Sequence, residues 1–172
     1  DGQREGPVRL AVSEREVGRA VVATGFPFRR KELLARYLRT FEGALSAFED
    51  LRRPGAAALD LAWVAEGVFD GFFELALAPW DVAAGSLMIT EAGGLIGNFA
   101  GDSDFLYQRE VVAGCPKIYG QLVQLLSPYT RVIKGGDEAA EVSALTPTSA
   151  LAAALVMSAA AAQPVLPEGE KS

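Results

Sequence analysis

The sequence lacks histidine altogether and has one cysteine, Cys115, among its 172 residues. The absence of histidine excludes Ser-His-Asp and Cys-His nucleophilic sites and every His-ligated metal centre. A single cysteine cannot form an internal disulfide, and no signal-peptide pattern precedes it. We therefore expect a cytoplasmic location and a buried, structural thiol. Chemistry in this chain has to come from carboxylates, hydroxyls and backbone groups.

Positive charge is also in short supply. Sixteen Lys and Arg residues stand against 22 Asp and Glu residues, a formal net charge of -6. The two basic clusters, residues 29–31 and 52–53, are short and are interpreted as solvated faces, so we expect no direct nucleic-acid partner. The Ala-rich apolar run at 149–162 is shorter than the roughly 20 residues of a membrane span, so we expect no membrane partner. Half of the residues are hydrophobic, which is enough to bury a core.

Strands and helices are expected to alternate from about residue 20 to 126, which predicts an α/β fold with a largely buried, layered sheet. Residues 1–10 are interpreted as a Gly-rich turn that leads into a short strand. Residues 130–172 are interpreted as a poorly ordered Ala/Pro-rich tail, which leaves 1–129 as the folded domain. The expected strands are 20–24, 72–77, 95–99 and 110–114, and the expected helices are 30–50, 56–67, 81–92 and 116–126.

Asp81 is the acid that most needs an explanation, because it lies between Trp80 and a run of small residues, 83–86, where charge is rare. One interpretation is an N-cap, in which the carboxylate accepts a bond from a backbone N–H of the helix and stabilises it by roughly 1 kcal/mol. Another is a ligand for a cation, and both can hold because a carboxylate has two oxygens. The small residues favour close approach by a packed element or by a ligand.

The segment "PWDVAAGSLMITEAGG", residues 79–94, resembles the C-terminal signature of the inositol monophosphatase family. The segments "VVATGFPF", "RRPGAAALDLAWVAEGVFDGFFE" and "REVVAGCP" are similar, in order and spacing, to the rest of that family's second half, especially in bacterial members. The resemblance covers residues 1–127. It implies the C-terminal half of a layered sheet-and-helix sugar-phosphatase fold.

The resemblance also implies Mg²⁺-dependent hydrolysis of phosphate monoesters such as myo-inositol 1-phosphate, a chemistry that uses oxygen ligands. Asp81 matches the aspartate that binds a magnesium ion near the leaving-group oxygen, and so has the catalytic and metal-binding role. Glu74 matches a glutamate that hydrogen-bonds an inositol hydroxyl. Gly55, Ala56 and Ala57 match a loop that lines the sugar pocket. From the residues alone, the favoured interpretation of Glu74 is an exposed edge acid of a strand, and that of Gly55 is an ordinary turn glycine.

The family's remaining metal ligands lie in its first half, in a glutamate-containing segment and an aspartate-proline-isoleucine-aspartate-glycine-threonine motif, and neither occurs in this sequence. Asp102 and Asp104 are the only acids of similar spacing, and their setting is that of a surface turn. We therefore expect the chain alone to hydrolyse inositol 1-phosphate no faster than buffer with Mg²⁺.

Two alternatives to an active phosphatase remain open. The first is a non-catalytic interaction protein, because bacterial relatives act with the transcription machinery, and the second is an inactive fragment. In each case an exposed sheet edge and apolar face favour a homo-oligomer.

Overall fold

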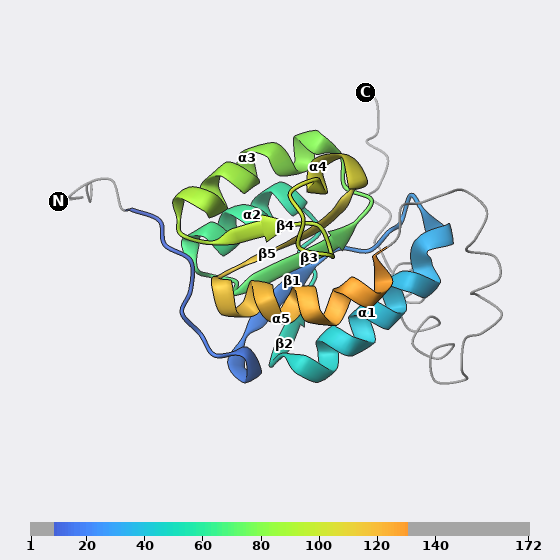
Figure 1. Cartoon of the computed structure of the whole chain (residues 1–172), viewed down its shortest axis with the longest axis horizontal. Helices are drawn as coiled ribbons and strands as arrows, with labels where there is room; N and C mark the ends of the chain where they lie inside the picture. Colours follow the sequence, from blue (N-terminus) through green and yellow to red (C-terminus); the bar gives the residue numbers. More distant parts are fainter. Residues whose placement is uncertain (1–8, 131–172) are drawn as a thin grey trace, which may run out of the picture.

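The computed structural model describes residues 9–130, which fold into three layers around one mixed five-stranded sheet. Helices α2 and α3 cover one face of the sheet, and helices α1 and α5 cover the other (Figure 1). The strands are β1 (Val21–Thr24), β2 (Asp50–Arg52), β3 (Gly71–Leu75), β4 (Leu95–Gly97) and β5 (Glu110–Gly114). The helices are α1 (Leu34–Ala47), α2 (Ala57–Glu66), α3 (Pro79–Glu91), α4 (Phe105–Gln108) and α5 (Pro116–Leu126). The α/β architecture predicted from the sequence is confirmed.

The strand order is β2-β1-β3-β5-β4, and its directions decide where loops gather. Strand β1 pairs in parallel with both β2 and β3, whereas β5 runs antiparallel to β3 and to β4. The carboxyl ends of β2, β1 and β3 therefore lie at one edge of the sheet, and β5 begins at that same edge. Loops that follow parallel strands at such an edge are a common place for ligand sites in α/β sheets.

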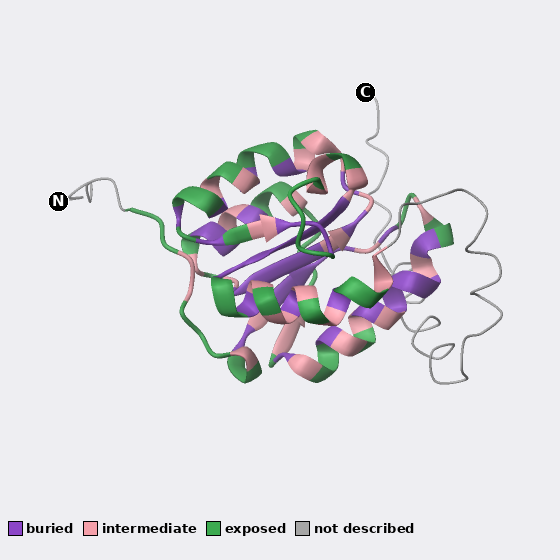
Figure 2. Cartoon of the chain, viewed as in Figure 1, coloured by how far each residue is buried: buried purple, intermediate pink, exposed green. Residues whose placement is uncertain are grey.

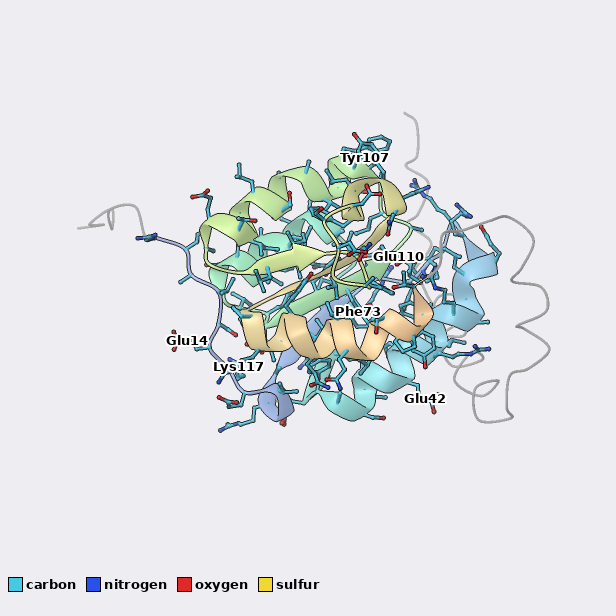
Figure 3. All side chains as sticks on the ribbon, viewed as in Figure 1. Glu14, Glu42, Phe73, Tyr107, Glu110 and Lys117 are labelled. Atoms are coloured by element: carbon cyan, nitrogen blue, oxygen red, sulfur yellow. The ribbon has the colours of Figure 1, made fainter. Side chains whose placement is uncertain are left out.

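Side-chain alternation along β3 divides the core into two halves. Phe72 packs with the residues of α2 and α3, and Phe73 packs with those of α1 and α5. Figure 3 labels Phe73 between the sheet and α5. The strands are mostly buried, while the outer faces of the helices are exposed (Figure 2). Each face of the sheet is thus covered, as the apolar strands at 20–24 and 110–114 predict.

Several boundaries differ from the sequence-based expectation. The helix expected at 30–50 ends at Ala47, and the chain then forms the short edge strand β2, which the sequence analysis missed. Strand β2 contains no β-branched residue and is held by backbone pairing to β1, so its side chains carry little strand signal. The strand expected at 72–77 ends at Leu75, because Ala76 adopts a left-handed φ of 68°.

Other predictions agree with the structure or lie outside it. Helix α2 stops at Gly67 with φ 81°, and α5 has the expected bounds. Cys115 is buried, with 3% of its surface exposed, as expected for a structural thiol. The strand expected near residue 10 is wrong for residues 9–16, which contain none, and the tail from 131 onward lies outside the described residues.

Within residues 9–130 no helix is both long and apolar enough to cross a membrane. The cytoplasmic location and the division at residue 129 stay predictions.

Candidate functional site

A cleft of about 700 Å³ opens at the sheet edge where β2, β1 and β3 end. It is lined by every residue that the sequence analysis selected for the site: Gly55, Ala56, Ala57, Glu74 and Asp81. These residues come from three separate segments of the chain. The fold therefore brings together, in one cleft, residues that are separated along the sequence.

The topology explains why these segments meet. Arg53 directly follows β2, Gly25 directly follows β1, and Glu74 is the last residue but one of β3. The first turns of α2 and α3 line the same cleft. A helix N-terminus carries a partial positive charge and unpaired backbone N–H groups, so both helices favour an anion here.

Glu74 lies on the α2 side of the sheet, since it shares the face of Phe72 along β3. Its carboxyl group occupies the space beside the Cα of Gly25, where a Cβ would collide with it. Burial raises the pKa of Glu74 to about 8, and the neighbouring charge of Asp60 adds to this effect, while Arg53 opposes it. At neutral pH most Glu74 carboxyls are thus protonated and able to donate a hydrogen bond.

Asp60 is a second buried acid at this edge, and the sequence analysis did not select it. It lies in the first turns of α2 with 0% of its surface exposed. Among residues 9–130 neither carboxyl oxygen accepts a hydrogen bond of good geometry. Burial raises the pKa of Asp60 to about 6, although the backbone of Ala56 and the charge of Arg53 are near enough to lower this pKa in part. Its position in the apolar segment "AALDLAW" is the signal that marks it in the sequence, because an unpaired buried acid is costly.

Asp81 is the third residue of α3, which corrects the prediction that it is the N-cap. The helix begins at Pro79, and the N-cap residue is Ala78. Asp81 Oδ2 accepts a hydrogen bond of 3.0 Å from the backbone N–H of Ala78, the reverse arm of a capping box. Proline at the first helical position explains the earlier start, because it needs no N–H partner there.

The small residues after Asp81 do not make room for a ligand. Ala83 and Ala84 are exposed, and neither lines the cleft. Gly85 faces α2, where an added Cβ would lie 2.6 Å from the Cβ of Leu61. Close packing of α3 on α2 therefore accounts for the glycine, and the interpretation of this turn as space beside a ligand is wrong.

Four arginines line the cleft together with the carboxyl groups of Glu74 and Asp81. Three of these arginines belong to the basic clusters at 29–31 and 52–53, which were interpreted from the sequence as solvated faces. The Arg53 guanidinium lies 5.0 Å from the ring centroid of Phe26 and 4.7 Å from that of Phe28. These distances are within the range of cation–π contacts. The others are Arg29, Arg30 and Arg109. Arg30 forms an ion pair with Glu32, so the positive charge of the cleft lining comes mainly from Arg29, Arg53 and Arg109, beside Glu74 and Asp81.

The donor set does not complete a magnesium site. Among residues 9–130, no group of three or more His, Cys, Asp or Glu residues could hold a metal ion. Asp102 and Asp104 are exposed, as a surface turn predicts. Mg²⁺ needs six oxygens in a near-octahedral array. Asp81 offers one carboxylate, and one of its two oxygens, Oδ2, already accepts a hydrogen bond from the N–H of Ala78.

The chain belongs to the inositol monophosphatase family. The sequence model of that family matches residues 2–131. The α/β fold agrees with this membership, and so does the position of the predicted residues around one cleft.

Similar proteins carry two kinds of name. The Nus factor SuhB of Pseudomonas aeruginosa is 43% identical over 124 residues, which are 70% of this chain and 46% of that protein. The extragenic suppressor protein suhB from Bartonella henselae matches with 38% identity and a TM-score of 0.63, over 69% of this chain and 47% of the other. An inositol monophosphatase from Anabaena (Nostoc) sp. PCC 7120 has 31% identity and a TM-score of 0.63, over 69% and 48%. The chain thus spans about half the length of the relatives it matches.

Proposed function

We propose that this chain forms the sugar-binding side of a phosphate monoester phosphatase site whose substrate is an inositol or sugar monophosphate. The observation that carries the proposal is that one cleft is lined by Glu74, Asp81 and the turn at 55–57 together. Two helix N-termini and a surplus of arginine suit an anionic ligand. Family membership supports this reaction class.

Each residue then has a distinct role. A protonated Glu74 donates a hydrogen bond to a ring hydroxyl, and the backbone at 55–57 borders the sugar ring. Asp81 has one carboxylate oxygen fixed by Ala78, which orients the other oxygen for a cation beside the leaving group. Mg²⁺, when bound, would polarise the phosphate and activate water. The further ligands it needs come from outside residues 9–130.

Complementation tests the proposal. The full chain is mixed with the separately produced N-terminal half of the Pseudomonas aeruginosa relative, and phosphate release from myo-inositol 1-phosphate is measured with Mg²⁺. We expect no turnover by either half alone and turnover by the mixture. Asp81→Asn should abolish this turnover, whereas Glu42→Gln, an exposed change on α1, should not. A mixture that associates by gel filtration but releases no phosphate would count against the proposal.

A second candidate is a protein–protein role with the transcription machinery, in keeping with the Nus factor name of the Pseudomonas aeruginosa relative. The observation in its favour is an apolar stretch on the outer face of α3, where Trp80 is 81% exposed and Leu87 is 64% exposed. A surface of this kind also suits a homo-oligomer. Co-purification of RNA polymerase subunits that is lost in Leu87→Ser, a change on α3 outside the cleft, would favour this candidate over the phosphatase.

A further inference from the structure

Two non-glycine residues of the described chain have a left-handed backbone, and they face each other across the cleft edge. Ala76 has φ 68° and Arg109 has φ 61°. Leu75 and Glu110 form the last register pair of β3 and β5, so Ala76 and Arg109 come next in line. Figure 3 labels Glu110, the residue directly after Arg109. Left-handed φ is costly for residues with a Cβ, so two in contact need a compensating interaction.

Hydrogen bonds of Arg109 supply that compensation. Its carbonyl oxygen accepts a bond of 2.7 Å from the N–H of Ala76. Its guanidinium donates from Nη2 to the carbonyl of Ala76 at 2.6 Å and from Nε to the carbonyl of Leu77 at 2.9 Å. Bonds from a charged donor are shorter and stronger than neutral ones. One side chain thus holds two successive carbonyls.

The chain held by Arg109 leads directly to the functional carboxylate. Leu77 is followed by Ala78, whose N–H donates to Asp81 Oδ2 at 3.0 Å, and whose carbonyl accepts from the N–H of Asp81 at 3.0 Å. Arg109, half-buried, and all the residues from 74 to 81 line the cleft. The carbonyl of Leu77 and the N–H of Ala78 belong to the same peptide group. That group therefore accepts a hydrogen bond from the Arg109 guanidinium and donates one to the Asp81 carboxylate.

We propose that Arg109 is the positioning residue for Asp81: its guanidinium fixes the 76–78 turn, and that turn sets where the Asp81 carboxylate points. The importance of Asp81 rests on the proposed function, but the positioning itself needs no ligand. A general stabilising role would instead spread over the whole β3–β5 pair. The two roles therefore predict different local effects.

Hydrogen exchange of the Ala78 amide in the full ¹⁵N-labelled chain tests the positioning. Arg109→Gly removes the guanidinium and keeps a residue that accepts φ 61°. We expect Ala78 exchange to be faster by about tenfold, with its amide shift moving toward that of Asp81→Asn, while Phe72 and Val112 in the strand ladder stay protected. Arg109→Lys, which can donate to one carbonyl, should give an intermediate rate.

Ala76→Gly is the matched control, because it relieves the backbone at the same turn and leaves the guanidinium in place. It should keep the Ala78 rate within about twofold of the parent. The proposal is overturned if folded Arg109→Gly and Arg109→Lys proteins both keep the parental Ala78 rate and shift. It is also overturned if Ala76→Gly speeds exchange as much as Arg109→Gly. Loss of inositol phosphate binding without any change at Ala78 would contradict the positioning alone and leave the proposed function intact.

Discussion

The free energy of unfolding of this protein should depend on pH through Glu74, and replacement of Glu74 by glutamine should remove most of that dependence. Burial raises the pKa of Glu74 from 4.5 to about 8 in the folded chain. The folded state therefore binds more protons than the unfolded state between these values, and the free energy of unfolding falls as pH rises. The stabilisation is complete below pH 4.5 and is lost as pH passes about 8.

The magnitude follows from the two pKa values. Each pKa unit corresponds to about 1.4 kcal/mol, which gives an upper bound of about 5 kcal/mol for a fully desolvated group. Glu74 borders a cleft that water enters, and solvent screening lowers this to about 3 kcal/mol. In Glu74→Gln no proton is exchanged at this position. Part of the effect is already lost at pH 5, so the variant should gain about 2 kcal/mol relative to the parent between pH 5 and pH 8.5.

Urea unfolding at several pH values between 5 and 8.5 measures this difference directly. Glu42→Gln on α1 serves as the control, because its carboxyl is exposed (Figure 3), and its difference from the parent should stay nearly constant. A Glu74→Gln difference that changes by less than about 0.5 kcal/mol over this range would refute the reasoning, since Glu74 would then be as solvated as a surface acid.

Two further predictions concern glycines. Gly25→Ala places a Cβ where the Glu74 carboxyl lies, so we expect inositol phosphate binding to weaken by about tenfold while the melting temperature changes little; unchanged affinity would argue against Glu74 as a contact. Gly85→Ala places a Cβ 2.6 Å from that of Leu61 and should cost about 1–3 kcal/mol in urea unfolding. Gly120 is the control, because it is an exposed helical glycine of α5 with nothing within 4 Å of an added Cβ, and Gly120→Ala should stabilise by up to about 1 kcal/mol. Equal effects of Gly85→Ala and Gly120→Ala on the free energy of unfolding would contradict the close packing of α3 on α2.

The sequence predicted more of the fold than of the site's detail. Periodicity and Gly or Pro stops were enough to locate α2 and α5, because both helices carry strong local signals at their ends. Strand β2 was missed because its stability comes from pairing with β1, which is non-local.

The site residues themselves came from the family resemblance. Their convergence depends on the parallel order of three strands, which no local pattern encodes. Arg109 was missed for the same reason, since its bond to the turn at 76–77 is a tertiary fact. Asp60 differs, because an acid within an apolar helix segment is a local signal that could have marked it.

The central claim is that this cleft binds the sugar side of a phosphate monoester. An NMR titration of the full ¹⁵N-labelled chain with myo-inositol 1-phosphate tests it most directly. We predict saturable, millimolar binding that shifts the amides of Gly55, Ala57 and Glu74, with the shifts lost in Glu74→Leu, which can no longer donate a hydrogen bond, and kept in Glu42→Gln. Shifts confined to residues outside the cleft, or none at all at millimolar ligand, would contradict the claim.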